Sequence, residues 1–286
     1  MTKSILQLRF IAHLKILQFV IVSLFIPTSI FCEETTPSQN VIVLTPQRCG
    51  THWLLYSIRY LTKASPVSGL EENGTLFAGN SQFDVFGEPI NRNTYFLIHA
   101  HTPNSIIWRG YEQDKLILII RDYKESILRM FDNFLFIKMA IGKRHNDVIF
   151  NDLPPYYAVI TWYFENLEYF EQFKGEKLLL YYEELLLQPE SVYKNILSFL
   201  GASDQFFADF MHDLEFHKET CLNFYNSYRF GSKTHGKDFK FHSKKLKQEE
   251  LTEFDKLVQN NYPSLWEKYL YRYKETRPVE EYNGEG

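Results

Sequence analysis

The sequence predicts an α/β fold, a three-layer sandwich in which helices cover both faces of a central, mostly parallel sheet. Two observations carry this prediction. Short runs of β-branched and other apolar residues recur along the chain, and they alternate with longer segments of helical periodicity. The chain of 286 residues is also long enough for one large domain with a full core.

The first 32 residues are predicted to be an export signal or an uncleaved membrane anchor that lies outside the fold. Three basic residues precede an apolar run over 16–26, and Glu33 and Glu34 follow. A basic lead, a short apolar core and a polar exit are typical of secretory signals, although the run is short for a membrane span. We therefore expect the secretory pathway, with membrane attachment if the leader is kept, or the cytoplasm if the leader does not function.

The body of the chain divides into a polar linker over 33–40, a domain over 41–275 and a flexible tail over 276–286. Apolar runs predict strands at VIVL (41–44), YFLIHAH (95–101), KLILII (115–120) and KLLLYY (177–182). Helical patterns predict helices over 51–62, from about 122 to 140, and over 154–173, 189–201 and 251–260. Residues 63–94 are rich in Gly, Ser and Asn and are expected to be irregular.

Individual residues support these boundaries. Trp53, Leu54, Ile58 and Leu61 share one face of the helix predicted over 51–62. Gly201 closes the helix predicted over 189–201, because glycine readily takes the left-handed conformation that ends helices. The predicted helices therefore have both an apolar face and a defined end.

Charge and cysteine content exclude several classes of protein. A net charge of -4 gives no reason to expect a nucleic-acid partner. The three cysteines, Cys32, Cys49 and Cys221, are too few for a disulfide framework, and their spacing gives no zinc signature. A Cys49–Cys221 bridge is conceivable in an oxidising compartment, but separate thiols are favoured.

The segment VIVL-TPQRCGTHW joins a predicted strand, a tight loop and the start of a helix. Unpaired N–H groups in the first turn of a helix point outward and bind phosphate-like groups. Arg48 adds positive charge, and Gly50 permits close approach of the backbone. The loop lacks the first glycine and the lysine of a P-loop, which argues against an ordinary NTPase. A plain strand-to-helix turn with a surface arginine stays equally open on these residues alone.

This segment resembles the 5'-phosphosulfate loop of the sulfotransferases that use 3'-phosphoadenosine-5'-phosphosulfate (PAPS). The family pattern is Pro-Lys/Arg-Ser-Gly-Thr-x-Trp. The matching residues are Arg48, Gly50, Thr51 and Trp53, whereas Cys49 and His52 depart from the usual serine and threonine.

Two further segments resemble the same family. In IIRDYKESILR (119–129), Arg121 stands where the family holds the 3'-phosphate, and Arg129 replaces a serine. Ser126 is an alternative hydroxyl there, and an ion pair of Arg121 with Asp122 or Glu125 is the structural alternative. HAHTP (99–103) resembles the Lys-x-His-x-Pro pattern, with His101 on the catalytic histidine.

The second half of the chain adds two weaker matches. Tyr182 falls on a tyrosine that lies near the adenine in the family. GSKTHGKDFKFHSKKL (231–246) occupies the place of a cofactor loop, with Lys233, Gly236 and Lys237 as candidate 3'-phosphate contacts, although a solvated basic loop explains them equally well. The resemblance spans about residues 41–270 in the family's order.

The resemblance implies a P-loop-like sulfotransferase architecture and transfer of a sulfuryl group from PAPS to a hydroxyl or amine, without a metal. It implies catalytic roles for Arg48 and His101, and cofactor contacts from Arg48, Cys49, Gly50, Thr51, His52, Trp53, Arg121, Arg129, Tyr182, Lys233, Gly236 and Lys237. Histidine suits the role of base because it ordinarily titrates near about 6.5. The acceptor is expected to be a hydroxylated small molecule or glycoconjugate, shaped by residues 63–94 and 130–160.

Two alternatives stay open on the sequence. A kinase of related P-loop fold would need a P-loop lysine and magnesium ligands. An exported binding protein without activity would keep the fold but lose the base. Binding of adenosine 3',5'-bisphosphate, of ATP with magnesium, or of neither would separate the three.

Overall fold

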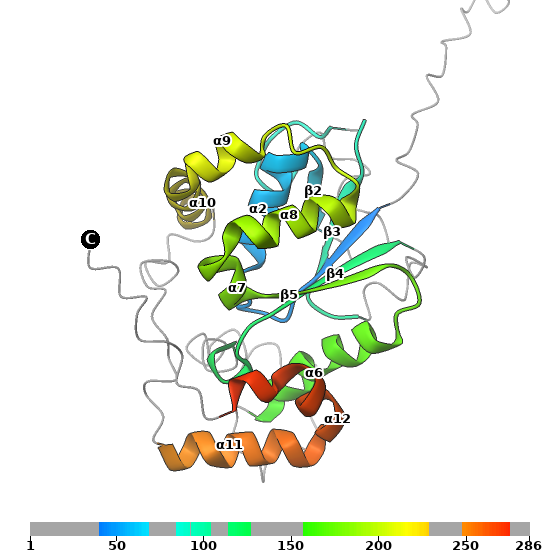
Figure 1. The fold of residues 1–286 in the computed structure, drawn as a ribbon, viewed down its shortest axis with the longest axis vertical. Coiled ribbons are helices and arrows are strands. Elements are labelled where there is room, and N and C mark those ends of the chain that lie inside the picture. Colours follow the sequence, from blue (N-terminus) through cyan, green and yellow to red (C-terminus); the bar gives the residue numbers. More distant parts are fainter. Residues whose placement is uncertain are drawn as a thin grey trace, which may run out of the picture. The chain divides into compact units, whose positions relative to one another are not determined.

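The computed structural model describes residues 40–68, 84–91, 93–103, 114–126, 157–228 and 248–274. All of them belong to one compact unit, Pro37–Gly286. Its centre is a parallel sheet with the strand order β2-β3-β1-β4-β5 (Figure 1). The strands are β1 (Val41–Leu44), β2 (Ser65–Ser68), β3 (Phe96–Ala100), β4 (Lys115–Ile120) and β5 (Lys177–Tyr181).

The register of the sheet brings the ends of β1 and β3 level, and β4 continues two residues further. Leu44, the last residue of β1, pairs with Ala100 of β3 and with Leu118 of β4. All three strands are parallel, so the segments that follow them leave the sheet at the same edge. Ligand sites of open parallel sheets lie at this carboxyl edge.

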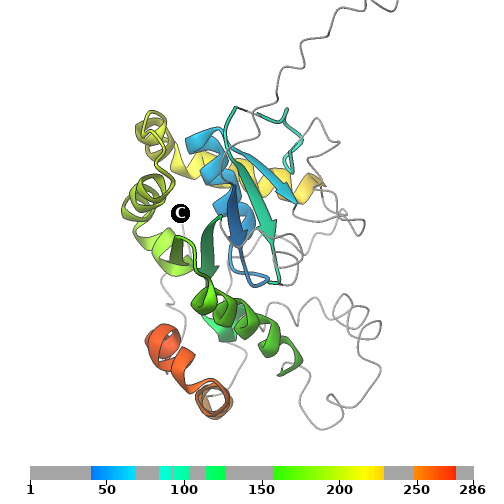
Figure 2. The same ribbon diagram turned by 90° about the vertical axis from the view of Figure 1, so that its right-hand side faces the viewer.

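Helices cover both faces of the sheet, as Figures 1 and 2 show together. One face carries α2 (Thr51–Thr62), α7 (Tyr182–Leu187), α8 (Pro189–Leu200), α9 (Phe207–His212) and α10 (Leu214–Tyr228). The other carries α6 (Tyr157–Gln172), α11 (Gln248–Asn261), α12 (Pro263–Leu265), the π-helical turn η4 (Trp266–Leu270) and the 3₁₀ turn η5 (Tyr271–Tyr273).

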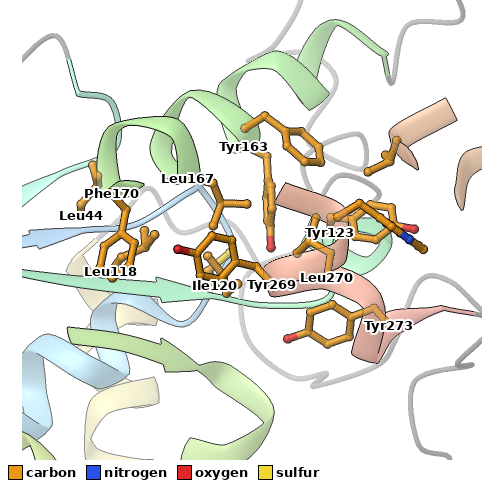
Figure 3. Packing of buried hydrophobic residues seen from close by; sticks show 14 of the residues in the cluster. Leu44, Leu118, Ile120, Tyr123, Tyr163, Leu167, Phe170, Tyr269, Leu270 and Tyr273 are labelled. Atoms are coloured by element: carbon orange, nitrogen blue, oxygen red, sulfur yellow. The ribbon is translucent and has the colours of Figure 1, made fainter. Parts of the chain in front are cut away.

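Alternating side chains of the buried strands build a core on each face. Leu116, Leu118 and Ile120 of β4 pack with the α6 and C-terminal aromatic residues seen in Figure 3. Ile117 and Ile119 of the same strand point the other way and pack with α2 and α8. Because successive strand residues face opposite sides, a continuous apolar run is what a strand covered on both faces requires.

The predicted α/β three-layer fold is confirmed, with two corrections. Residues 63–94 were expected to be irregular, yet they contain β2. β2 is an edge strand, where a residue such as Pro66 is tolerated because only one side of the strand is paired. The strand predicted over 177–182 ends one residue early, and Tyr182 begins α7.

The N-terminal leader, the tail after 275 and most of the helix predicted after 122 lie outside the described residues. Within the ranges that are described, no helix combines the length and the apolar character needed to cross a membrane.

Candidate active site

The turn between β1 and α2 brings backbone N–H groups to the carboxyl edge of the sheet. Arg48 and Gly50 have left-handed backbone conformations, with φ of 68° and 86°, on either side of Cys49. Such alternation turns successive N–H groups toward one side and forms anion-binding hollows. Gly50 takes this conformation without steric cost, whereas for Arg48 the cost is roughly 1–2 kcal/mol. Strain of this kind clusters at functional turns.

α2 begins at Thr51 without a side-chain cap. Gly50 occupies the cap position and has no side chain to accept a hydrogen bond, and the first turn contains no acidic residue. The first-turn N–H groups and the positive end of the helix dipole therefore suit an anion. Arg48 lies half-buried just before this helix start. His52, also half-buried, is the second residue of the helix.

His101 is held in one orientation by its neighbours. Its Nδ1 lies 2.9 Å from the carbonyl oxygen of Thr45. A carbonyl oxygen only accepts, so Nδ1 carries the proton and Nε2 keeps the lone pair that accepts one. Asn166 of α6 donates from Nδ2 to the carbonyl oxygen of His101 at 3.1 Å. The ring is thus fixed from β1 and the backbone from α6.

The hydroxyl of Thr45 joins the histidine to the start of α2. It lies 2.8 Å from Oγ1 of Thr51, 3.3 Å from Nδ1 of His101 and 3.4 Å from Nε2 of His99. The two imidazole rings meet edge to face, with centroids 4.4 Å apart. Sequence reasoning did not single out Thr45 or Asn166. Thr45 stands just before the residues that match the family pattern, Asn166 falls on no motif, and the histidine that each contacts is distant in the chain.

Arg121 follows β4 and is almost completely buried, with 3% of its surface exposed. Its guanidinium carbon lies 4.6 Å from the centroid of the Tyr182 ring. One nitrogen is 3.5 Å from Oε1 of Glu125, so the ion pair expected as the structural alternative is present. This pair does not exclude an anion beside Arg121, since a guanidinium has five N–H donors.

The ring of Tyr182 also touches the turn before α2. A methyl group added to Gly50 would lie only 2.3 Å from its Cδ2 atom. One aromatic ring therefore contacts both Gly50 and Arg121, and the two predicted phosphate-binding groups lie at the same edge of the sheet. Tyr182 is 4% exposed. Its contact with adenine stays a prediction.

Ser126 and Cys49 brace the turn from inside. Ser126 donates to the carbonyl oxygen of Gln47 at 2.7 Å, and the thiol of Cys49 points at the same hydroxyl. Ser126 is fully buried and holds the turn, and its alternative contact with a phosphate stays a prediction. Burial raises the pKa of the Cys49 thiol to about 12. Cys49 and Cys221 are both free, as the sequence favoured.

For the other residues that were predicted to contact the cofactor, the structure gives less information. Trp53 is half-buried and packs against Tyr56 and Phe210, with ring centroids 6.0 Å away in each case. Its role beside adenine stays a prediction. Arg129, Lys233, Gly236 and Lys237 lie outside the described residues. In the described part of the chain, no group of three His, Cys, Asp or Glu side chains is placed to hold a metal ion.

Buried charges lie behind Arg121. Burial raises the pKa of Asp122 to about 7, with Glu183 adding to the rise and Lys124 opposing it. Burial also lowers the pKa of Lys124. Both shifts have the same cause, since a charged group loses hydration in the interior.

Together these groups can bind an anionic leaving group at the start of α2 and accept a proton at His101. Comparison with known proteins identifies the family of the chain. A family model described as a sulfotransferase domain matches residues 38–269. No curated protein sequence matches the chain.

The solved structures that are similar to this chain include three sulfotransferases. One is the mouse sulfotransferase SULT7A1 complexed with PAP, at 15% identity over 84% of this chain and 90% of that one, with a TM-score of 0.48. The sulfotransferase domain from the Curacin biosynthetic pathway has 12% identity, coverage of 58% and 75%, and a TM-score of 0.41. The sulfotransferase from Alicyclobacillus acidocaldarius has 12% identity, coverage of 66% and 94%, and a TM-score of 0.38. Since the family match extends over most of the chain, the protein belongs to the sulfotransferase domain family and is a sulfuryl-transferring enzyme.

Proposed function

We propose that this sulfotransferase uses PAPS as its donor and His101 as its base, and that the acceptor is a hydroxyl or an amine. One observation carries the proposal. The uncapped start of α2 and the oriented ring of His101 meet at the hydroxyl of Thr45. An anion site and a proton acceptor that share one residue suit a displacement between an anionic donor and a protonated acceptor.

The residues at this edge fit a nucleotide that is phosphorylated at both ends. The N–H groups of the first turn of α2, with Arg48 beside them, suit the 5'-phosphosulfate. Arg121 suits the 3'-phosphate, because a guanidinium pairs well with phosphate oxygens. The Tyr182 ring, which touches Gly50 and lies beneath Arg121, sets these two groups in a fixed relation.

The donor supplies a sulfuryl group whose departure leaves negative charge on a 5'-phosphate. Arg48, the N–H groups of residues 49–52 and the hydroxyl of Thr51 stabilise that charge. Nε2 of His101 takes the proton of the acceptor, since Nδ1 already carries one. Positioning supplies the rest, as in phosphoryl transfer.

The acceptor and the cellular compartment are proposed from the sequence. We propose a hydroxylated small molecule or glycoconjugate, held by segments 63–94 and 130–160. We also propose a lumenal location behind the N-terminal leader, which requires PAPS import into that compartment. Protease protection of the full chain in sealed microsomes tests the location, and digestion without detergent would contradict it.

The donor test is calorimetry on the full chain with adenosine 3',5'-bisphosphate (PAP), and with ATP and magnesium as the comparison. We expect PAP to bind and each of Arg48→Ala and Arg121→Ala to weaken it. Unchanged affinity in either variant would remove that residue from the donor site. Preference for ATP with magnesium would instead favour the kinase alternative, against which the family assignment argues.

The test of the base is PAP release from PAPS in the presence of phenols, steroids, sugars and amines in turn. His101→Ala is expected to bind PAP normally and to lose about 10²-fold or more in turnover. Turnover retained in this variant would exclude His101 as the base. PAP binding without turnover on any acceptor would favour the non-catalytic alternative.

A further inference from the structure

The carboxylate of Glu183 links the C-terminal turn η5 to Asp122, the residue after Arg121, through two hydrogen bonds. The hydroxyl of Tyr273 donates to Oε2 of Glu183 at 2.7 Å. Oε1 of the same carboxylate accepts from the backbone N–H of Asp122 at 3.0 Å. One carboxylate thus bridges the C-terminal segment and the turn that carries Arg121. Tyr273 belongs to the same buried cluster as Ile120, the last residue of β4 (Figure 3).

Lys124 ties the same turn to the C-terminal segment a second time. Its side chain is 1% exposed, and Nζ donates to the carbonyl oxygen of Tyr273 and, at 3.1 Å, to Oδ1 of Asp255 in α11. The hydroxyl of Tyr123 donates to the same Asp255 oxygen. A buried ammonium keeps its charge only where such partners surround it, so the contacts hold η5 and α11 firmly against the end of β4.

The peptide that follows Arg121 is held at both its carbonyl oxygen and its N–H group. Tyr163 of α6 donates to the carbonyl oxygen of Arg121 at 2.6 Å, and Glu183 holds the N–H group that follows it. These two bonds fix the peptide after Arg121, and with it the direction in which the arginine side chain leaves the strand. A bonded Tyr273 hydroxyl keeps the Glu183 carboxylate in the rotamer that reaches this peptide.

We propose that Tyr273, acting through Glu183, is a positioning residue for Arg121, so that the C-terminal segment shapes the donor site without touching the donor. The inference rests on the proposed function, in which Arg121 holds the 3'-phosphate. Burial and then the Glu183 charge raise the pKa of Tyr273 well above its usual value, so the hydroxyl stays protonated and able to donate. A carboxylate that loses this donor gains rotamer freedom and holds the Asp122 N–H less tightly.

The test compares Tyr273→Phe with Tyr181→Phe in the full chain. Tyr181 is the matched control, because its hydroxyl donates to the carbonyl oxygen of Tyr269 at 3.3 Å and so anchors the same segment without reaching Glu183. Calorimetry measures Kd for PAP and, by displacement, for AMP, which lacks the 3'-phosphate. The ratio of the two values reports the 3'-phosphate contact alone.

We expect Tyr273→Phe to weaken PAP about 5- to 10-fold and AMP less than 2-fold, while Tyr181→Phe changes neither by more than 2-fold. Glu183→Gln has a single amide oxygen, which cannot accept from both the Tyr273 hydroxyl and the Asp122 N–H, so it should repeat the selective loss and serves if Tyr273→Phe does not fold. Equal weakening of PAP and AMP, or equal behaviour of the two tyrosine variants, would overturn the positioning role.

Arg121→Ala separates this inference from the function on which it rests. It should abolish the advantage of PAP over AMP. If it leaves that advantage intact, or if the unchanged chain does not bind PAP, the donor assignment fails and the positioning role falls with it. If Arg121→Ala behaves as expected and Tyr273→Phe matches its control, only the positioning role is wrong.

Discussion

At the scale of single residues, the proposed role of His101 as the base depends on how its ring is held as much as on its presence. Asn166 is fully buried, and its Nδ2 donates to the carbonyl oxygens of His101 and Trp162. Removing a buried donor leaves a carbonyl without its partner, which costs about 1–3 kcal/mol. Part of that free-energy cost should appear as greater mobility of the His101 backbone and ring rather than as a loss of global stability.

We therefore expect Asn166→Ala to lower kcat about tenfold and to leave Kd for PAP within 2-fold, because the start of α2 is untouched. Asn261→Ala is the matched control, since that exposed amide also donates to a carbonyl four residues earlier in its helix. Steady-state kinetics and calorimetry measure the two effects. An equal loss of PAP affinity and kcat would mean that Asn166 supports the fold and not the base.

Cys49 lies in the turn between β1 and α2, yet its thiol belongs to the core. It is fully buried, and burial raises the pKa of Cys49, and likewise of Cys221, to about 12. The thiolate is the reactive form, so both thiols should be inert near pH 8. In a Cys32→Ser background, we expect a disulfide reagent such as DTNB to count no thiols in the native protein and two after denaturation. Rapid native reaction would show that the loop opens.

At the scale of elements, the turn into α2 tolerates only glycine at position 50. A side chain there would meet the Tyr182 ring at 2.3 Å and would also be strained at a φ of 86°. Gly201→Ala isolates the strain, because that glycine has a φ of 65° and open space around it.

Gly50→Ala should lower the free energy of unfolding by about 2–4 kcal/mol and weaken PAP more than tenfold, because the ring must move. Gly201→Ala should cost about 1 kcal/mol and leave PAP binding unchanged. Chemical denaturation and calorimetry decide between them. PAP affinity that survives Gly50→Ala would show that the turn adapts and is not a rigid anion site.

The elements also show what the sequence could predict. The strands over 41–44 and 115–120 were predictable because burial on both faces demands an unbroken apolar run. The edge strand β2 was not, since its Ser-Pro-Val-Ser sequence has no such run. The helices α9 and α10 were missed as well, because α10 in particular has a weakly apolar face.

The residues of the candidate site likewise include some that the sequence could predict and some that it could not. The grouping of the turn 45–50, His101 and Arg121 was expected from the family resemblance, and the carboxyl edge that parallel strands share accounts for it. Thr45, Asn166 and Glu183 could not be foreseen, because each acts through a partner that is more than 50 residues away in the chain. Local patterns predict candidate ligand contacts, and only the folded chain shows which residues hold those candidates in place.

At the scale of the whole molecule, the sheet and the C-terminal helices are joined through buried charges whose stability depends on pH. Asp122 is 3% exposed, and its carboxylate lies 3.7 Å from Nζ of Lys124. Burial is the largest cause of the rise of its pKa from 3.8 to about 7; Glu183 and Asp255 add to it, and Lys124 opposes it. Between about pH 4 and pH 7, Asp122 therefore keeps its proton in the folded protein and has released it in the unfolded chain.

This carboxyl group favours folding below about pH 4, and its contribution is lost as the pH rises to about 7. Asp122→Asn removes the titration and keeps an oxygen that can accept from the Lys124 N–H, as Oδ1 does now. The free energy of unfolding of the wild type, minus that of the variant, should fall by an amount of the order of a few kcal/mol between pH 4 and 7, and then stay level. Urea denaturation at each pH measures this difference.

Asp114→Asn serves as the comparison, because burial raises the pKa of that partly exposed carboxyl in the same direction. Solvent weakens the effect of burial on the pKa of Asp114. The free energy of unfolding of the wild type, minus that of Asp114→Asn, should therefore change less with pH. A difference for Asp122 that is constant from pH 4 to 8 would show that Lys124 keeps the carboxylate ionised throughout. The cluster would then be a permanent ion pair, and acid rather than neutral pH would loosen the C-terminal helices from the sheet.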